Sequence, residues 1–474
     1  MEVTLSFSSP FSDRPFGAHL SQAPQNWQLL SADEHGFAGL SLAGTWARPT
    51  SAGLLGRNGC EVEIRICCES TGLAPRPDLN WQAAETFADG TWKGRLEKIP
   101  SGGPYRLETR LNPKGNKTKE WAWRGDQRHF LAVGDAWILA GQSNVSGYGA
   151  PPYDDDPVLG LHLFGQDGRW RMASHPLHDG SECGFPPSMQ PYAPGHSPFL
   201  QFGKVLQRRL ARPIAFLPAA LGGSTLSEWE EGGRLAENLF DMLGKAGVTP
   251  AGMVFGQGES DAKGKSAATY GERFAQAVGH WRKRIGSATL PIVTYQLSRY
   301  YSKNPGDDDE AWSVIREAQR SAAKKLSRVS VVPTLDLPLG DTIHFSSAAN
   351  RLLGRRMAES ALGMGQGADN ESPPDLISAH RISPNKVELS FQSVQDRLDS
   401  AEPHAQPFRI WDIQGEVTIQ RILYPMDNRI EILLSRPLDA EARVSAGFGE
   451  NPPTLPWDVD RRLPILAFHH QPIT

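Results

Sequence analysis

The sequence contains little cysteine and no long apolar run, and each of these absences excludes a class of protein. Its four cysteines are irregularly spaced over 474 residues and form no CxxC pair: Cys60, Cys67, Cys68 and Cys183. This pattern argues against a disulfide framework and a cysteine-based zinc site, and we expect small buried side chains instead. No apolar stretch approaches the length that spans a bilayer, so we expect no membrane role.

An excess of basic charge is also missing. The 49 Lys and Arg residues are balanced by 53 Asp and Glu residues, for a net charge of -4. Nucleic-acid binding requires a basic surplus on one face, so we expect a small or neutral partner and no nucleic acid. The first residues, MEVTLSFSSPFSDRPFG, lack the basic patch and apolar core of a signal peptide. We therefore expect a cytoplasmic protein, or a periplasmic or secreted one whose leader has been removed. The oligomeric state has no signal in the sequence.

The chain is too long for one compact core, and its character changes twice. Residues 1–130 contain alternating segments such as CEVEIRICC (60–68) and PYRLETRL (104–111), without a long helical period. This alternation predicts an all-β domain, a sandwich or a jelly-roll-like fold, whose last strands lead into the next domain.

Residues 131–366 alternate apolar runs with amphipathic helices. The runs are AWILAG, PIAFLPAALGG, GMVFGQG, LPIVTYQL and RVSVVPTLDL. Between them, apolar residues recur at helical spacing, as in Phe199, Phe202, Leu206 and Leu210, and again in Tyr270, Phe274, Val278, Trp281 and Ile285. Continuous apolar strands between such helices predict an α/β domain with a parallel sheet covered on both faces.

The last part of the chain, 367–474, begins with a polar, proline-containing linker, GADNESPPD (367–375). Beyond it, alternating segments such as KVELSFQSV and NRIEILLS are separated by Asp, Asn, Pro and Gly. They predict a second β domain, a small sandwich. Each β domain would either bind a ligand or serve as scaffold.

Polar residues directly follow the apolar runs of the α/β domain. They form four blocks, at 141–144 (GQSN), 222–225 (GGST), 257–261 (QGESD) and 341–344 (DTIH). Ligands of open α/β sheets bind beyond the carboxyl ends of the strands, so these blocks are expected to meet. Together they supply a hydroxyl nucleophile, an imidazole base, a carboxylate and hydrogen-bond donors, which is what acyl transfer requires.

These blocks resemble those of the SGNH (GDSL-like) hydrolase superfamily, and within it the bacterial sialate O-acetylesterase and acetylxylan esterase branch. The resemblance covers residues from about 80 to 362. It implies a three-layer, flavodoxin-like hydrolase domain between two β domains. It also implies a serine esterase that removes acetyl groups from a carbohydrate and needs neither cofactor nor metal.

The resemblance also implies the roles of individual residues. Ser143 would be the nucleophile, His344 the general base and then acid, and Asp341 the group that orients His344. The backbone N–H groups of Ser143 and of Gly222 or Gly223 would form the oxyanion hole. A third donor is commonly an Asn side chain of the third block, and here QGES departs from that pattern. We expect the Gln257 amide to replace it.

Two further features of these blocks bear on the choice of carboxylate and on the type of turn at the serine. Asp336 also precedes the histidine, but the DxxH spacing favours Asp341, and Asp336 is expected to cap a strand end. The position two after Ser143 is Val145 rather than Gly, so this is not the GxSxG turn of ordinary α/β hydrolases.

Four residues are candidate substrate contacts. Gln142 adjoins the nucleophile, and Glu259 would either contact the substrate or brace its loop. Trp229 would stack on a sugar ring or pack a helix start, with even chances. Arg299 follows the VTYQLS run, where it would bind a sialate carboxylate.

Acidic runs and histidines outside the blocks are not assigned a metal. The runs at 154–156 and 307–310 lack the ligand spacing of a calcium loop and are expected to be solvated, the second at the positive end of a helix. His175, His178 and His196 would border the substrate cleft, but their spacing does not suggest zinc.

The predicted substrate is an acetylated glycan, either sialic acid or a xylan- or xyloglucan-type polysaccharide. Two alternatives come from other classes. One is a carbohydrate-binding protein with an inert hydrolase domain, which the intact Ser143, Asp341 and His344 argue against. The other is a lipase or thioesterase of the same fold, which the absence of an apolar lid-like segment disfavours.

Overall fold

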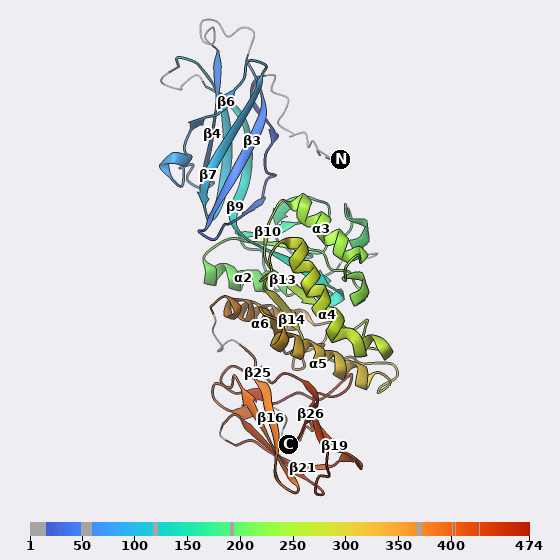
Figure 1. Ribbon diagram of the computed structural model, residues 1–474. Coiled ribbons are helices and arrows are strands. Elements are labelled where there is room, and N and C mark those ends of the chain that lie inside the picture. The colour runs from blue at the N-terminus through green and yellow to red at the C-terminus, as the bar shows by residue number, and fades with distance from the viewer. Residues whose placement is uncertain are drawn as a thin grey trace.

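The computed structural model describes residues 16–48, 59–116, 122–189, 194–366, 372–400, 402, 404–425 and 427–474. Three domains follow one another along its long axis, with the N-terminal β domain at one end and the C-terminal β domain at the other (Figure 1). Most of the predicted linker at 367–375 lies outside the described residues. None of the described helices is both long and apolar enough to cross a membrane.

The N-terminal domain is built from two β-sheets around an apolar core. One sheet has the order β1 (Gly17–Gln22), β3 (Phe37–Ala47), β7 (Thr91–Pro100) and β6 (Glu85–Thr86). The second contains β2 (Leu29–Ser31), β4 (Cys60–Cys68), β5 (Gln82–Ala83), β8 (Gly102–Pro113) and β9 (Trp123–Gly141), and a 3₁₀ turn, η1 (Pro77–Leu79), lies between β4 and β5. Val62, Ile64 and Ile66 alternate inward from β4, as the sequence pattern predicts.

Strand β9 belongs to two domains at once. Its first part pairs antiparallel with β8 up to Val133, and its last part pairs with the parallel strands β12 (Ile214–Pro218) and β13 (Pro250–Gly256) from Asp135 to Gly141. The predicted boundary at residue 130 therefore falls inside one continuous strand. The N-terminal domain leads without a linker into the strand that ends at the GQSN block.

The central domain is a three-layer α/β structure, which confirms the predicted fold class. Its sheet has the order β11, β10, β12, β9, β13, β14 (Ile292–Tyr295) and β15 (Val329–Val332). All neighbours are parallel except β10 (Leu161–Phe164) and β11 (Trp170–Met172), which pair antiparallel. These two strands come from a segment that the sequence analysis did not assign to the sheet.

Helices cover both faces of this sheet. Trp137 and Leu139 of β9 point to the side of α2 (Phe199–Leu210) and α6 (Ser347–Gln366), whereas Ile138 and Ala140 point to the opposite side. That second layer contains α3 (Arg234–Ala246), α4 (Gly264–Ile285) and α5 (Asp309–Lys325). The shorter helical turns are α1 (Ser143–Ser146), η2 (Pro186–Ser188) and η3 (Leu226–Glu228).

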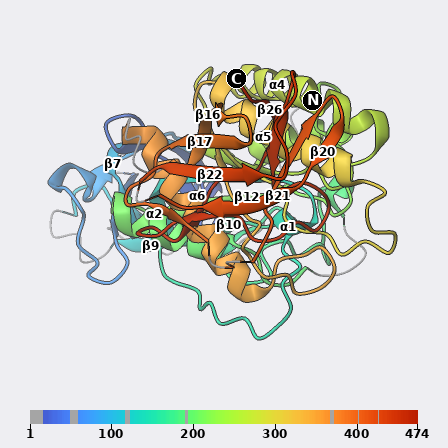
Figure 2. The same cartoon turned by 90° about the horizontal axis from the view of Figure 1, so that it is seen from below.

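The C-terminal domain is a second β structure around its own apolar core. One sheet, seen in front of the central domain in Figure 2, has the order β16 (Asp375–Ser383), β17 (Lys386–Gln392), β22 (Arg429–Leu434) and β21 (Ile419–Leu423). A second has the order β20 (Gly415–Val417), β19 (Phe408–Asp412), β23 (Arg443–Ala446) and β26 (Phe468–Pro472). A third, small sheet contains β18 (Leu398–Asp399), β24 (Trp457–Asp458) and β25 (Leu463–Pro464).

Candidate active site

Ser143 stands at a sharp turn between strand β9 and helix α1. The strand ends at Gly141, whose φ is 130°, and a Cβ atom at this position would lie 2.0 Å from the Gly256 carbonyl oxygen. Only glycine tolerates this conformation and this close approach. Ser143 is the first residue of α1 and its side chain is 8% exposed, so it is presented at the carboxyl edge of the sheet.

Asp341 and His344 form a hydrogen-bonded pair within one short loop. Asp341 Oδ2 lies 2.7 Å from His344 Nδ1, and Asp341 Oδ1 accepts hydrogen bonds from the backbone N–H groups of Ile343 and His344. Burial opposes ionisation of Asp341, but these three hydrogen bonds outweigh it and lower the pKa of the carboxyl. The carboxylate thus fixes the ring orientation of His344 and leaves Nε2 as the free nitrogen.

The rival acid, Asp336, is occupied elsewhere. Both its carboxylate oxygens accept hydrogen bonds from Arg356 of α6, at 2.8 and 2.6 Å. The expected strand-end cap is therefore replaced by a two-point ion pair between the segment after β15 and helix α6. This pairing leaves Asp341 as the carboxylate that contacts His344.

Asn144, to which the sequence analysis assigned no role, joins the serine loop to the histidine loop. Its Oδ1 accepts the backbone N–H of Phe345 at 3.1 Å, and its Nδ2 donates to Ile343 O at 3.4 Å. The two residues that flank His344 are therefore bonded to the neighbour of Ser143. The structure records no direct hydrogen bond between the side chains of Ser143 and His344.

Tyr148 and Glu259 extend this connection. The Tyr148 ring stacks on the His344 ring with centroids 4.7 Å apart, and Glu259 Oε1 accepts the Asn144 amide at 2.9 Å. Burial raises the pKa of Glu259, against the opposing effect of the Asn144 hydrogen bond. Of the two alternatives for Glu259, the geometry supports bracing of the loop.

Backbone donors are available beside Ser143. Within the described residues, the N–H groups of Ser143, Gly222 and Gly223 have no hydrogen-bond acceptor. Gly223 has a φ of 72° and no atom within 4 Å of an added Cβ, so the turn after β12 is open on this side. These groups are free to donate to an oxyanion.

Gln257 does not supply the third donor that the sequence analysis assigned to it. Its side chain is fully buried, and its Nε2 already donates to Asp261 Oδ2 at 2.7 Å and to Ser224 O at 3.2 Å. A third acceptor, Gln142 Oε1, also accepts the backbone N–H groups of Gly258 and Ser260. Gln142 is 3% exposed and braces the 257–260 loop, so the prediction that it binds substrate is not supported either.

Trp229 also differs from its predicted role as a sugar platform. Its ring is fully buried in the core beside Phe255, and its indole N–H donates to Ser224 Oγ at 3.1 Å. The alternative interpretation, packing beside a helical turn, is what the structure shows, since Trp229 directly follows η3. A buried ring has no face to offer to a sugar.

Arg299 remains a candidate for contact with substrate. It is partly buried, and its one recorded hydrogen bond, to Leu337 O at 3.4 Å, connects it to the segment that leads to Asp341. Its Nε has no partner among the described residues. An unpaired guanidinium nitrogen is suited to a carboxylate or a hydroxyl group.

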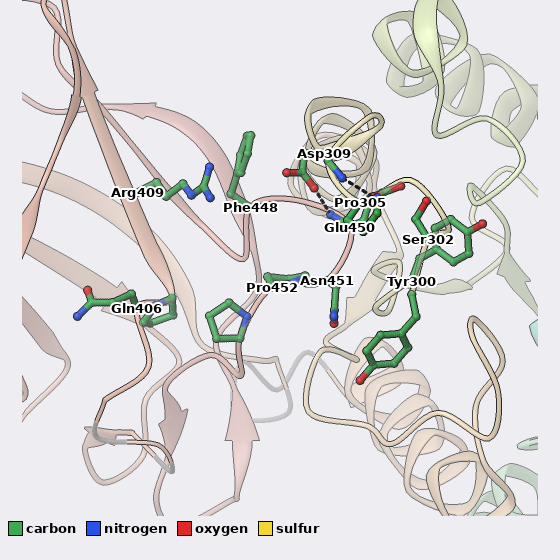
Figure 3. Close-up of a pocket in the computed structure, with 14 residues that line it drawn as sticks. Tyr300, Ser302, Pro305, Asp309, Gln406, Arg409, Phe448, Glu450, Asn451 and Pro452 are labelled. Carbon is green, nitrogen blue, oxygen red and sulfur yellow. Dashed lines mark hydrogen bonds between the residues drawn. The ribbon is translucent and has the colours of Figure 1, made fainter.

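A cleft of about 470 Å³ lies between the central and C-terminal domains, next to the loop of Asp341 and His344. Tyr301 N donates to Thr342 O at 2.9 Å, which connects the cleft wall to that loop. Figure 3 shows Arg409 and Phe448 on the C-terminal side of the cleft, and Tyr300 and Ser302 on the side of the central domain. The other lining residues are Tyr301, Pro305, Gly306, Asp309, Gln406, Pro407, Glu450, Asn451, Pro452 and Pro453.

The histidines and acids outside the blocks are placed differently from expectation. The side chains of His175, His178 and His196 are buried and do not line an open cleft. Asp155, the middle residue of the run 154–156, is buried too, so only part of that run is solvated. The second run lies at the start of α5, as predicted, but Asp309 accepts the backbone N–H of Glu450 and Glu310 contacts His469, so only part of this run is solvated.

Sequence comparison identifies relatives of the central domain. Residues 133–363 match the model of a family described as carbohydrate esterase, sialic acid-specific acetylesterase. A probable carbohydrate esterase of Arabidopsis thaliana is 28% identical over 253 residues, which cover 48% of this chain and 89% of the plant protein.

Structural comparison extends the similarity to the whole fold. A carbohydrate acetylesterase from Xanthomonas citri superposes with a TM-score of 0.64 at 22% sequence identity, over 94% of this chain and 98% of that one. At this identity the similarity concerns the fold, including the flanking β domains.

Proposed function

Because residues 133–363 match the model of a carbohydrate esterase family, we propose that the protein is a serine-dependent carbohydrate O-acetylesterase. In this proposal Ser143 is the nucleophile, His344 and Asp341 are the acid–base pair, and the substrate is an acetylated glycan.

One observation carries the proposal: the hydrogen-bonded pair of Asp341 and His344 is attached through Asn144 to the turn that presents Ser143. A weakly acidic hydroxyl becomes a useful nucleophile only when an oriented base lies next to it. The chain supplies the base, the group that orients it and a rigid connection to the hydroxyl.

The reaction would proceed in two halves. Ser143 Oγ attacks the acetyl carbonyl carbon while His344 Nε2 takes the proton of the Ser143 hydroxyl. The resulting oxyanion accepts hydrogen bonds from the backbone N–H groups of Ser143 and of Gly222 or Gly223. The C–O bond to the sugar then breaks, and His344 returns the proton to the sugar oxygen. Water, deprotonated by His344, attacks the acetyl-enzyme, and acetate leaves with Ser143 restored.

The cleft of Figure 3 supports a glycan as the substrate. It combines rings, from Tyr301 and Phe448, with polar side chains such as Gln406 and Asn451. Sugars bind to such surfaces through their C–H faces and their hydroxyl groups. Sialic acid and xylan- or xyloglucan-type polysaccharide are the two candidate classes, and the unpaired Arg299 Nε would favour the carboxylate of a sialic acid.

The test is acetate release by the wild type and by Ser143→Ala from acetylated xylan, xyloglucan and sialic acids. We expect release from one class and a loss of at least about 10⁴-fold in the mutant. Ser227→Ala, at an exposed serine of the 222–229 turn, is the matched control and should keep wild-type activity. Release that persists in Ser143→Ala would refute the assignment of the nucleophile.

The alternatives give different outcomes in the same assays. Binding of a glycan without acetate release from any acetylated glycan or nitrophenyl acetate would identify a carbohydrate-binding protein with an inert domain. Nitrophenyl octanoate hydrolysed faster than the acetate would identify a lipase or thioesterase.

Asn144→Ala tests the positioning role of the amide. We expect kcat to fall about 10²-fold with KM little changed, because a small displacement of His344 relative to Ser143 slows the chemical step without removing a substrate contact. An unchanged kcat would show that the two loops hold their positions without Asn144.

A further inference from the structure

A cluster of buried metal-ligating side chains lies outside the proposed catalytic residues. Asp155 Oδ2 is 3.6 Å from His175 Nε2 and 3.8 Å from His196 Nε2. The three side chains are 2%, 3% and 0% exposed, respectively. They come from the segment between α1 and α2, far enough apart in sequence that no spacing motif connects them.

The atoms that face one another in this cluster have no hydrogen-bond partner among the described residues. This holds for Asp155 Oδ2, for His175 Nε2 and for both ring nitrogens of His196. Buried polar atoms are almost always satisfied, so several orphaned atoms in one place require an explanation. The cluster of Glu310, His469 and His470 differs, because both nitrogens of His469 are already bonded, to Ser445 and Glu310.

We propose that Asp155, His175 and His196 bind a divalent transition-metal ion, zinc being the best fit, with water as the fourth ligand. Zinc prefers nitrogen and carboxylate ligands in a tetrahedron, and ligand atoms about 2.0 to 2.1 Å from the ion lie about 3.3 Å from one another. The separations of Asp155 Oδ2 from the two imidazole nitrogens, 3.6 and 3.8 Å, are only slightly longer, and all three ligand atoms lie within 4.8 Å of one another. A small rotation of the side chains would close the site.

Lys204 is the partner of the remaining carboxylate oxygen. Its ammonium group pairs with Asp155 Oδ1, which leaves Oδ2 directed toward the two imidazoles. Such outer contacts orient the ligands of metal sites. Lys204 is also a cation close to the proposed ion, so it would weaken metal binding through repulsion.

The proposed ion would stabilise the segment that leads away from Ser143. Gly149 and His196 exchange both backbone hydrogen bonds, at 3.0 and 2.9 Å, and Tyr148, next to Gly149, stacks on His344. A ligand bond at His196 would therefore hold Tyr148 against the catalytic imidazole. The ion has a structural role in this proposal and takes part in no bond-making step.

The experiment is zinc binding by the full chain without an affinity tag, after removal of metals with a chelator and dialysis. Elemental analysis and calorimetry should show about one zinc ion per chain, and saturating zinc should raise Tm by about 5 °C. Mg²⁺ and Ca²⁺, which prefer all-oxygen sites, should do neither. Absence of stoichiometric zinc binding by the folded wild type would overturn the proposal.

Variants identify the ligands. His196→Ala should lose the stoichiometric zinc and the Tm shift, whereas His35→Ala, which removes a histidine that is 75% exposed beside Glu34, should keep both. Zinc binding that survives in a folded His196→Ala would place the ion elsewhere and refute the assignment.

A second variant keeps the test decisive if His196→Ala fails to fold. Lys204→Met removes the competing cation and leaves all three ligands in place. We expect it to be less stable than the wild type in chelator, to bind zinc about tenfold more tightly, and to recover its Tm when zinc is added. If Lys204→Met is not rescued by zinc, the cluster is an ordinary ion-pair network and the proposal fails. None of these measurements depends on esterase activity.

Discussion

The central domain is joined to its two β neighbours by different means. On the N-terminal side the backbone of β9 passes from one domain into the other, and the buried His162 contacts Trp27 O through Nδ1 at 2.7 Å. On the C-terminal side the connection consists of a backbone hydrogen bond from Tyr300 N to Glu450 O at 2.8 Å and of side-chain contacts, among them those of the fully buried Arg316 of α5. Its guanidinium donates to the carbonyl groups of Leu297, Ser298, Gly447, Gly449 and Glu450.

The two junctions also lie differently with respect to the proposed active site. The N-terminal junction is at the start of the parallel strands, whereas Ser143 follows their carboxyl end. The C-terminal junction contacts the segment 297–301, and Tyr301 of this segment donates to Thr342, two residues before His344. We therefore expect disturbance of the C-terminal junction to reach catalysis and disturbance of the N-terminal one to affect stability alone.

The largest expected effect is that of Arg316→Met. The methionine keeps much of the apolar volume but leaves several buried carbonyl groups without donors, so we expect a loss of about 3 to 5 kcal/mol in the free energy of unfolding. The same change removes the hydrogen bonds to the carbonyl groups of Leu297 and Ser298. Because this segment contacts the loop of Asp341 and His344, kcat/KM for nitrophenyl acetate should fall about tenfold. Denaturant unfolding and steady-state kinetics measure the two effects.

Arg320→Met is the matched control on the same helix. Arg320 is also buried at this junction, but it contacts Asp375 and Leu376 rather than the segment 297–301. It should lose stability and keep its kcat/KM. An equal loss of activity in both variants would show that the catalytic loop responds to general destabilisation of the junction.

The N-terminal junction should be sensitive to acid. Burial lowers the pKa of His162 to about 4, against the opposing effect of its hydrogen bond to Trp27 O. The unfolded chain, with a histidine pKa of about 6.5, then binds more protons than the folded one between these values. Stability therefore falls as the pH decreases from about 6.5 to about 4, with His162 contributing about 3 kcal/mol.

His162→Asn keeps a donor near the position of Nδ1 and removes the titration. Its unfolding free energy should depend less on pH than that of the wild type over this range, while kcat/KM at pH 7.5 stays unchanged. An identical pH dependence in the variant would exclude His162 as a source of acid sensitivity. A fall in activity at pH 7.5 would show that disturbance of the N-terminal junction also reaches catalysis.

The smallest expected effect concerns the cleft at the C-terminal junction. Phe448→Ala removes a partly exposed ring, and KM for an acetylated oligosaccharide should rise about fivefold, equivalent to about 1 kcal/mol, with kcat unchanged. Hydrolysis of nitrophenyl acetate should not change. Ile413→Ala, at an apolar side chain of the same domain that is 70% exposed and outside this cleft, serves as the control.

Local patterns predicted the layers of the central domain and the contact between Asp341 and His344. The stripe of Tyr270, Phe274 and Val278 has the helical period and is buried in α4. Asp341 and His344 lie within four residues, so their contact depends only on one loop. Such features can be predicted from the sequence because the interacting residues are close together in the chain.

Features that depend on distant residues were not predictable. The predicted role of Gln257 is not supported because its amide donates to Ser224 O, in the turn after β12, and to Gln142 Oε1. The burial of Asp155 depends on His196, some forty residues further along the chain. The last strands of the N-terminal domain were expected to lead into the next domain, but a single strand across the boundary was not, because the burial of β9 changes from partial to nearly complete where the sequence suggested a new domain.

Strand β9 limits the positions at which recombination can exchange the domains of this protein. A crossover between residues 130 and 131 would cut a backbone ladder in which β8 pairs on one side of the break and β12 and β13 on the other. A crossover between α6 and β16 would separate whole elements and cut no ladder among the described strands, although it would replace the contacts of Arg316 and the backbone hydrogen bond from Tyr300 N to Glu450 O. The N-terminal domain must therefore be inherited together with the serine to which it leads, whereas the C-terminal domain is the part that can be exchanged.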